Sequence, residues 1–189
     1  MEQSFAKSLE NLRTDYLDAL VLHSPLRKFD DTMIVWKMFE SFVDSGKVKV
    51  LGISNCYDIN KLKTLYNLAR HKPKVLQNRF YSDSNFDTEI RVFCKENDIL
   101  YQSFWTLTAN RRALASNKVR EIAKEKGLTP QTLMYAFMMS LGATPLSGTT
   151  NNNHMDEDIS VMRRVIEEGD IFSKEEQINF AALLGMPRL

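Results

Sequence analysis

The sequence lacks the features that mark several classes of protein. It has two cysteines in 189 residues, Cys56 and Cys94, which is too few and too far apart for a disulfide framework or a cysteine metal site. Its apolar runs are strand-sized and far shorter than a membrane span, so we expect no membrane partner. Its first residues are charged and amphipathic, without a signal-peptide core, which favours a cytoplasmic location.

Neither sign of charge is in excess. The chain has 25 basic and 24 acidic side chains, for a formal net charge of +1. A surface that binds nucleic acid usually needs a basic excess, so we expect no nucleic-acid partner.

The sequence also lacks a G-x-G-x-x-G motif after a strand, and it lacks a P-loop. Its apolar residues alternate between helical and strand periods along the chain. We predict strands at 17–23, 48–54, 74–80, 99–104 and 143–147, and helices at 5–12, 32–47, 58–70, 86–97, 117–126, 129–141, 155–168 and 173–184. Strands apolar enough to be buried on both faces, separated by helices, predict a parallel α/β sheet. Periodicity alone does not choose between an open sheet and a barrel.

Motifs at the strand ends carry a resemblance to a known family. They are DYLDALVLHSP (15–25), VDSGKVKVLGISN (43–55), KVLQNRFY (74–81), ILYQSFWTLTAN (99–110) and PLSGTTNNNHMDEDI (145–159). In this order they resemble the fourth to eighth strand units of the aldo-keto reductases. The resemblance implies a TIM-type (β/α)₈ barrel. We therefore expect residues 1–189 to form one domain, a partial barrel of about five parallel strands with outer helices that is incomplete at its N-terminal side.

The resemblance implies NAD(P)H-dependent reduction of an aldehyde or ketone, with a small carbonyl compound as substrate. Of the family's catalytic Asp, Tyr, Lys and His, only the histidine maps onto this sequence, as His23. Whether the chain is an enzyme therefore stays open. The alternative is a catalytically inactive, truncated remnant that acts as a residual cofactor binder or an oligomerising half-barrel.

The candidate catalytic and nicotinamide-binding residues follow predicted strands. His23 ends the first strand, on the side where barrels of this kind place their sites, and its imidazole could hydrogen-bond a carbonyl oxygen. The alternative is an ordinary histidine at a strand end. By resemblance, Ser54, Asn55 and Gln77 hold the nicotinamide carboxamide, for which amide side chains offer both a donor and an acceptor. The alternative for Ser54 and Asn55 is turn chemistry.

Further residues match the rest of the cofactor site. Phe104 takes the place of the aromatic residue that stacks on the nicotinamide, although core packing explains a phenylalanine there equally well. Trp105 and Leu107 lie where the family wraps the pyrophosphate. The loop Ser147, Gly148 and Thr149 precedes a helix whose N-terminus would favour a phosphate, and the alternative is a plain N-capped loop.

The choice between NADP and NAD depends on the last motif. The family prefers NADP, but here Leu146 replaces a lysine and His154 falls where an arginine often binds the 2′-phosphate, which weakens that inference. Glu157 and Asp158 match the acidic and polar pair near the adenine.

Five strands that begin at the fourth unit cannot close a barrel of normal geometry. The strands at 17–23 and 143–147 should therefore keep unpaired edges, and Val21, Val50, Ile53 and Val75 should lack opposing partners. We expect self-association through these edges.

Overall fold

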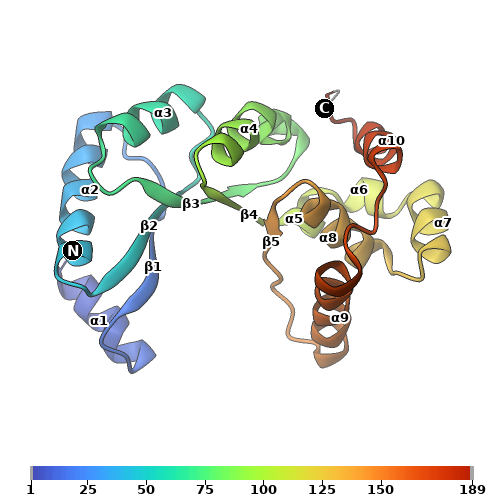
Figure 1. Cartoon of the computed structure of the whole chain (residues 1–189), viewed down its shortest axis with the longest axis horizontal. Coiled ribbons are helices and arrows are strands. Elements are labelled where there is room, and N and C mark those ends of the chain that lie inside the picture. The colour runs from blue at the N-terminus through green and yellow to red at the C-terminus, as the bar shows by residue number, and fades with distance from the viewer. Residues whose placement is uncertain (1, 188–189) are drawn as a thin grey trace. The chain divides into compact units, whose positions relative to one another are not determined.

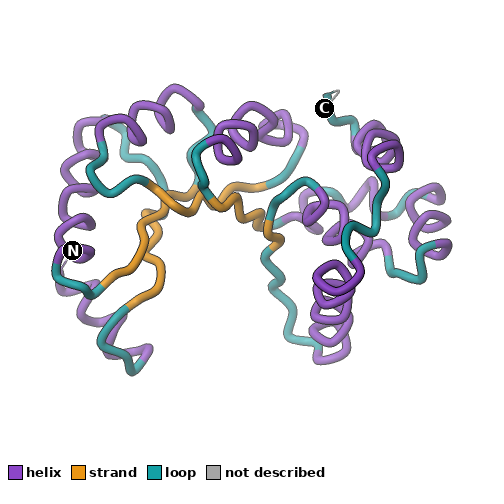
Figure 2. The backbone as a smooth tube through the Cα atoms, viewed as in Figure 1, coloured by secondary structure: helices purple, strands orange, loops and turns teal. Residues whose placement is uncertain are grey.

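A computed structural model of the chain describes residues 2–187. Its strands are β1 (Leu17–Leu22), β2 (Val48–Ser54), β3 (Pro73–Arg79), β4 (Leu100–Phe104) and β5 (Thr144–Pro145). They form one parallel sheet in the order β1-β2-β3-β4-β5 (Figure 2). Because β1 and β5 stand at the ends of this order, the sheet is not closed, as the sequence predicts.

Helices precede, separate and follow the strands (Figure 1). They are α1 (Glu2–Leu12), α2 (Phe29–Asp44), α3 (Ile59–Leu68), the 3₁₀ helix η1 (Ser82–Asp87), α4 (Thr88–Glu96), α5 (Thr106–Ala109), α6 (Arg111–Leu114), α7 (Asn117–Glu125), α8 (Pro130–Ser140), α9 (Asn152–Glu168) and α10 (Lys174–Leu184). The alternation of strand and helix is that of an α/β fold.

The chain divides into two compact units. The first comprises residues 1–77 and 96–99, and the second comprises residues 78–95 and 100–189. Each unit is described by itself below.

In the first unit, α2 packs on β2 and buries one apolar face. Trp36 is fully buried, Phe39 and Phe42 are nearly so, and the Phe5 ring of α1 stacks on Phe42 with centroids 4.1 Å apart. Apolar residues along α2 at helical spacing put these rings on the covered face. The helix begins three residues earlier than the predicted 32–47 and ends at Asp44, because Gly46 takes a left-handed conformation (φ 74°) that helices use to terminate.

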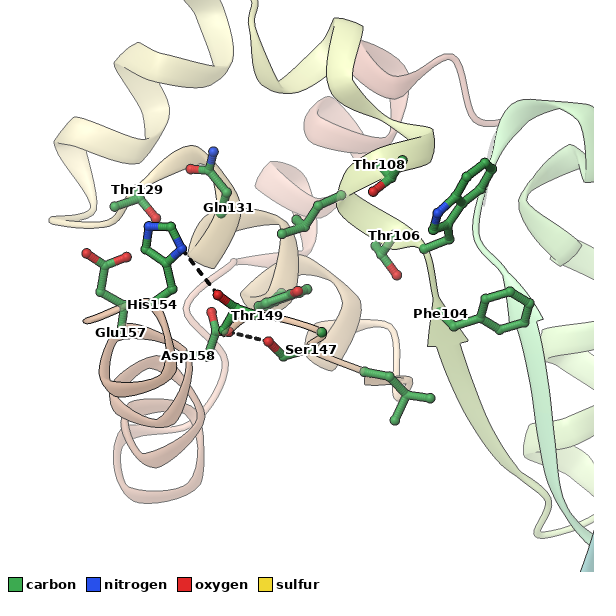
Figure 3. A pocket seen from close by; sticks show the side chains of 15 residues that line it. Phe104, Thr106, Thr108, Thr129, Gln131, Ser147, Thr149, His154, Glu157 and Asp158 are labelled. Atoms are coloured by element: carbon green, nitrogen blue, oxygen red, sulfur yellow. Dashed lines mark hydrogen bonds between the residues drawn. The ribbon is translucent and has the colours of Figure 1, made fainter. Parts of the chain in front are cut away.

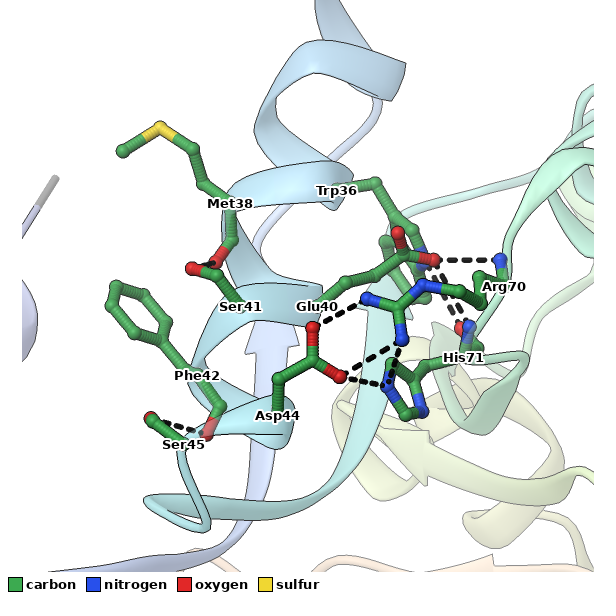
Figure 4. A network of polar contacts seen from close by, with 9 residues as sticks. All are labelled: Trp36, Met38, Glu40, Ser41, Phe42, Asp44, Ser45, Arg70 and His71. Atoms are coloured by element: carbon green, nitrogen blue, oxygen red, sulfur yellow. Dashed lines mark hydrogen bonds and ion pairs between the residues drawn. The ribbon is translucent and has the colours of Figure 1, made fainter.

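A polar network holds the end of α2 to the segment that leads into β3 (Figure 4). The buried Glu40 carboxylate accepts hydrogen bonds from the backbone N–H groups of Arg70 (2.7 Å) and His71 (3.0 Å). The Asp44 carboxylate accepts hydrogen bonds from two guanidinium nitrogens of Arg70 and from the His71 ring. These hydrogen bonds lower the pKa of the Asp44 carboxyl. Trp36 Nε1 donates to the His71 carbonyl oxygen (3.1 Å). The network thus joins the end of α2 to the two residues that lie just before β3.

In the second unit, α8 forms the centre of the core. Every residue from Thr132 to Met138 on this helix is buried. The Phe137 ring packs against Phe172 and Phe180, with ring centroids 5.6 and 4.9 Å apart. Thr129 caps the N-terminus of α8 in a capping box, with Pro130 as the first helical residue. A helix buried on nearly every face must be enclosed by other elements, here α7, α9 and β5 among them.

A left-handed turn before α4 corrects the prediction of a helix at 86–97. Asn85, Phe86 and Asp87 all have φ near 52° (52°, 52° and 51°), and α4 begins only at Thr88. The Phe86 ring is buried 5.1 Å from the Phe80 ring, and the buried Asp87 carboxylate accepts hydrogen bonds from Asn78 (2.7 Å) and Tyr101 (3.0 Å). These tertiary contacts outweigh the conformational cost of left-handed backbone.

The outer strands also differ from prediction. β1 is not buried on both faces: Asp18 and Ala19 are exposed and its apolar residues are half-buried. The predicted strand at 143–147 is reduced to Thr144–Pro145, and a proline is tolerated at such an edge position. The ladder then continues through one further hydrogen bond, from the Leu146 N–H to the Ser103 carbonyl oxygen (2.8 Å).

The expectation that four apolar side chains lack partners is wrong for two of them. Val21 and Val50 are half-buried, but Ile53 (1% exposed) and Val75 (6%) are buried. Ile53 shares the covered face of β2 with Leu51, two residues before it. Val75 lies directly beside Gly52, whose missing side chain leaves room for it.

Within residues 2–187, none of the helices combines the length and the apolar character that a membrane span requires.

Candidate functional site

In the first unit, the ends of β1, β2 and β3 bring polar groups together. Ser54 Oγ donates to the Gln77 carbonyl oxygen (2.8 Å), and the Asn55 N–H donates to the same atom (3.0 Å). Asn55 takes a left-handed conformation (φ 53°), which asparagine tolerates better than most residues. Its Nδ2 group donates to the His23 carbonyl oxygen (2.8 Å) and contacts Ser54 Oγ (3.2 Å). The predicted residues His23, Ser54, Asn55 and Gln77 are thus neighbours.

The cluster leaves two of its side chains near the surface. His23 is exposed and Gln77 is half-buried. The Tyr57 hydroxyl, 37% of whose residue surface is exposed, donates to Asn55 Oδ1 at 3.4 Å. Asn55 is therefore the central residue of the cluster, because it hydrogen-bonds the ends of both neighbouring strands and a phenol.

In the second unit, a cavity of about 740 Å³ lies between the end of β4, the start of α8 and the start of α9 (Figure 3). It is lined by Phe104, Trp105, Thr106, Leu107, Thr108, Thr129, Gln131, Tyr135, Leu146, Ser147, Gly148, Thr149, His154, Glu157 and Asp158. All the residues that the sequence predicts for the distal part of the cofactor site, from Phe104 to Asp158, line this one cavity.

The loop from Ser147 to Thr150 leads directly into α9. Asn151 caps that helix by accepting from the Asn153 N–H (2.9 Å), and Thr149 Oγ1 accepts from the Asn151 N–H (3.1 Å). The ring of His154 lies 3.5 Å from Thr149 Oγ1. A Cβ atom added to Gly148 would meet nothing within 4 Å, so the backbone of this loop faces open space.

A carboxylate and two hydroxyls form the floor beneath this loop. Ser147 Oγ donates to Asp158 Oδ2 at 2.6 Å, and the buried Tyr135 hydroxyl is hydrogen-bonded to Ser147. Burial raises the pKa of Tyr135, the bond with Ser147 lowers it in part, and the Asp158 carboxylate raises it again. Tyr135 therefore keeps its proton at neutral pH and serves as a hydrogen-bonding group.

The other wall of the cavity is aromatic. Trp105 is 52% exposed and adopts a left-handed conformation (φ 59°), while Phe104 is half-buried. The Arg79 guanidinium lies over the Trp105 ring, 4.4 Å from its centroid, and 5.8 Å from the centroid of Phe104. Both rings are thus part of a stacked cation-aromatic group beside the cavity.

Five lining residues were not predicted from the sequence. They are Thr106, Thr108, Thr129, Gln131 and Tyr135. Gln131 and Tyr135 are four residues apart on α8 and so share a helix face, but that spacing equally fits a buried helix. The sequence signal was therefore present without being specific.

Among the residues that the structure describes, no three His, Cys, Asp or Glu side chains are grouped in a way that could hold a metal ion.

Comparison with known proteins identifies the family. The sequence model described as "Aldo/keto reductase family" matches residues 1–176. The chain belongs to this family. Among curated members it is 28% identical to "Aldo-keto reductase family 4 member C11" of Arabidopsis thaliana, covering 94% of this chain and 62% of the relative. It is 27% identical to "Glyoxal reductase" of Bacillus subtilis, covering 91% of this chain and 57% of the relative.

Solved structures of aldo-keto reductases share the fold. An enzyme from a deep-sea metagenome library superposes with a TM-score of 0.83 at 19% identity, covering 99% of this chain and 66% of that structure. A protein from Brucella melitensis gives a TM-score of 0.81 at 21% identity, with 96% and 66% covered. The chain thus spans about three fifths to two thirds of the length of these family members, and the fold it shares is their (β/α)₈ barrel in part.

Proposed function

We propose that this chain forms the nicotinamide-nucleotide-binding part of an NAD(P)H-dependent oxidoreductase that reduces an aldehyde or ketone. The observation that carries the proposal is the cavity, whose hydroxyls, open glycine loop and helix N-terminus make a donor set suited to a nucleotide phosphate. Its volume of about 740 Å³ is in the range of a small-molecule site. Relatives that are named for a reductase activity, such as "Glyoxal reductase", support the reaction class.

Each polar group has a role in this proposal. Thr149 and the backbone N–H groups of the loop at Gly148 donate to phosphate oxygens, while Ser147 donates its hydroxyl proton to Asp158 and so positions that loop. Glu157 and Asp158 accept from the adenosine, and Trp105 with Leu107 covers the pyrophosphate. For the first unit taken by itself, family resemblance assigns Ser54, Asn55 and Gln77 to a nicotinamide carboxamide and the exposed His23 to the carbonyl of a small substrate. Phe104 offers the flat face on which a nicotinamide ring stacks. When bound, the nicotinamide supplies the hydride, and the protein supplies position and polarity.

Binding is tested by titrating the purified chain with NADH and NADPH up to millimolar concentration, followed by nucleotide fluorescence. We expect saturable, weak binding. Gly148→Glu should abolish nucleotide binding, because it places a carboxylate in the open space beside the loop and so repels the phosphates. The temperature of thermal unfolding should not change, since a Cβ atom at this position meets nothing within 4 Å. Gly148→Ala is the control and should bind. Well-folded protein that binds neither nucleotide would refute the proposal.

Turnover is tested separately. In the family the proton donor is a tyrosine, and none of the six tyrosines here stands in a matching motif. We expect this chain alone to reduce no carbonyl compound above background, since general-acid catalysis contributes roughly a hundredfold to ten-thousandfold. Reduction that His23→Ala abolishes would contradict this, and Tyr57→Phe would then identify the donor. Binding without turnover is the result that the remnant alternative also predicts.

A further inference from the structure

The charges that line the cavity are all of one sign. Among the described residues that line it, Glu157 and Asp158 are carboxylates, and none is a lysine or arginine. His154 is the remaining ionisable base, and a histidine carries charge only when protonated. At the position after Pro145 the lining residue is the apolar Leu146, whose backbone is fixed by the hydrogen bond to Ser103. The Arg79 guanidinium lies over the Trp105 ring on the other wall, so a dianionic group placed beside Leu146 and Asp158 would meet no lysine or arginine among the lining residues.

The carboxylate on the cavity floor is built into the site. Asp158 is half-buried and is held by Ser147 Oγ at 2.6 Å, and Ser147 is in turn bonded to the buried Tyr135. A phosphate that approached Ser147 would therefore lie within a few ångströms of a fixed negative charge. Glu157 projects from the same turn of α9, next to His154 (Figure 3).

A ribose hydroxyl, unlike a phosphate, is attracted to the carboxylates of Glu157 and Asp158. Carboxylates accept hydrogen bonds from ribose hydroxyls, and this is a general way in which proteins recognise NAD. A phosphate in the same place carries close to two negative charges and offers only acceptors. Repulsion between the carboxylates and a phosphate, with no cation between them, disfavours the complex with the phosphorylated nucleotide. Such repulsion provides specificity for the nucleotide without the phosphate.

We propose that this cavity selects NAD(H) over NADP(H). The carboxylates of Asp158 and Glu157 repel a 2′-phosphate, and the apolar Leu146 provides no positive charge to bind it. The proposal rests on the proposed function, because it concerns the same nucleotide site. It reverses the cofactor preference that family resemblance alone implies.

Calorimetric titration of the whole chain with NAD⁺ and NADP⁺, at fixed ionic strength, tests the selection. We expect NAD⁺ to bind at least tenfold more tightly, and the ratio to shrink as salt is raised, because salt screens the repulsion. The Asp158→Asn variant keeps an acceptor for Ser147 and removes the charge, so it should tighten NADP⁺ binding and narrow the ratio severalfold. Asp156→Asn makes the same change in net charge on α9 outside this cavity and should leave the ratio unchanged.

Leu146→Lys is a second, independent variant that should favour NADP⁺ even if Asp158→Asn folds poorly. Equal or tighter binding of NADP⁺ by the natural chain would overturn the selection while leaving the proposed function intact. A ratio that neither Asp158→Asn nor Leu146→Lys changes would overturn the assignment to these residues. Binding of neither nucleotide would refute the proposed function and this inference with it.

Discussion

At the scale of single residues, Gly52 is the position where the sheet tolerates no side chain. It pairs with Val21 on one side and Val75 on the other. A Cβ atom at Gly52 would lie 2.7 Å from the Val75 carbonyl oxygen and 2.9 Å from Val75 Cβ. Because one of these neighbours is backbone, the strands would have to separate.

We expect Gly52→Ala to lower the free energy of unfolding by about 1–3 kcal/mol, the usual cost of overpacking. Urea denaturation followed by circular dichroism measures it. Gly148→Ala is the control, since a Cβ atom there meets nothing within 4 Å, and we expect a change of less than about 0.5 kcal/mol. Equal losses of unfolding free energy at the two positions would show that the close contact with Val75 does not cause the destabilisation.

The buried Asp87 makes stability depend on pH. Burial raises its pKa above the ordinary value of 3.8, although hydrogen bonds from Asn78 and Tyr101 lower it in part. A raised pKa means that the native carboxyl holds its proton more tightly than the unfolded one. Its contribution to stability is therefore fully present below pH 3.8 and is lost as pH rises through the native pKa.

Asp87→Asn removes this titration and keeps an acceptor for Asn78 and Tyr101. We expect the variant to gain stability relative to the natural chain as pH rises from 3.8 towards neutrality, by about 1.4 kcal/mol per unit of pKa elevation. Urea denaturation at a series of pH values measures the difference. Asp83→Asn, an exposed residue of the same turn, is the control and should show little trend. A trend of opposite sign would mean that Asp87 is ionised and paired with Arg91.

At the scale of elements, the sequence predicts existence and order better than boundaries. The five strands and most helices follow from apolar periodicity, because each element must bury one face or two. The order of the strands follows from the resemblance carried by the strand-end motifs. The start of α4 does not follow, since it depends on the contact of Phe86 with Phe80 and on the hydrogen bond between Asp87 and Asn78. Apolar periodicity does not report such contacts. The same holds for the candidate site. The strand-end motifs predict the Ser147 loop, but they do not predict Tyr135, which lies on a helix whose apolar pattern indicates only that it is buried.

The connection between α2 and β3 depends on one buried carboxylate. Glu40 accepts two backbone N–H groups that precede β3, and β3 carries Gln77. Glu40→Ala would leave both donors without this acceptor, and hydrogen bonds to charged groups contribute about 1.5–3 kcal/mol each. We expect a loss of about 2–3 kcal/mol, measured by urea denaturation.

Glu40→Gln retains an acceptor oxygen and should lose less than half as much. Ser41→Ala, on the exposed side of the same helix, is the control for a substitution in α2. If Glu40→Gln and Glu40→Ala lost the same amount, the charge of Glu40 rather than its position as an acceptor would account for the effect.

At the scale of the whole molecule, each unit exposes apolar surface. In the first unit, β1 stands at the edge of the sheet with Leu20, Val21 and Leu22 only half-buried. In the second, α9 exposes Met155, Ile159, Met162 and Ile166, between 40% and 73% of each residue. Their spacing of four, three and four residues makes one continuous stripe on the helix. With a net charge of +1, the chain also has little charge repulsion to keep copies apart.

We expect the purified chain to self-associate, with β1 as one of the faces, because an unpaired strand edge offers a row of free backbone donors and acceptors to a second copy. Light scattering over a hundredfold range of concentration should show an average mass above 21.9 kDa that rises with concentration.

Ala19→Lys places a charge on the exposed part of β1 and should lower the average mass. Natural edge strands avoid pairing by the same means. Ala115→Lys adds the same charge at an exposed position after α6 and should leave association unchanged. A monomer at every concentration would show that the β1 edge is protected, whereas equal effects of the two lysines would show that association responds to net charge and not to this edge.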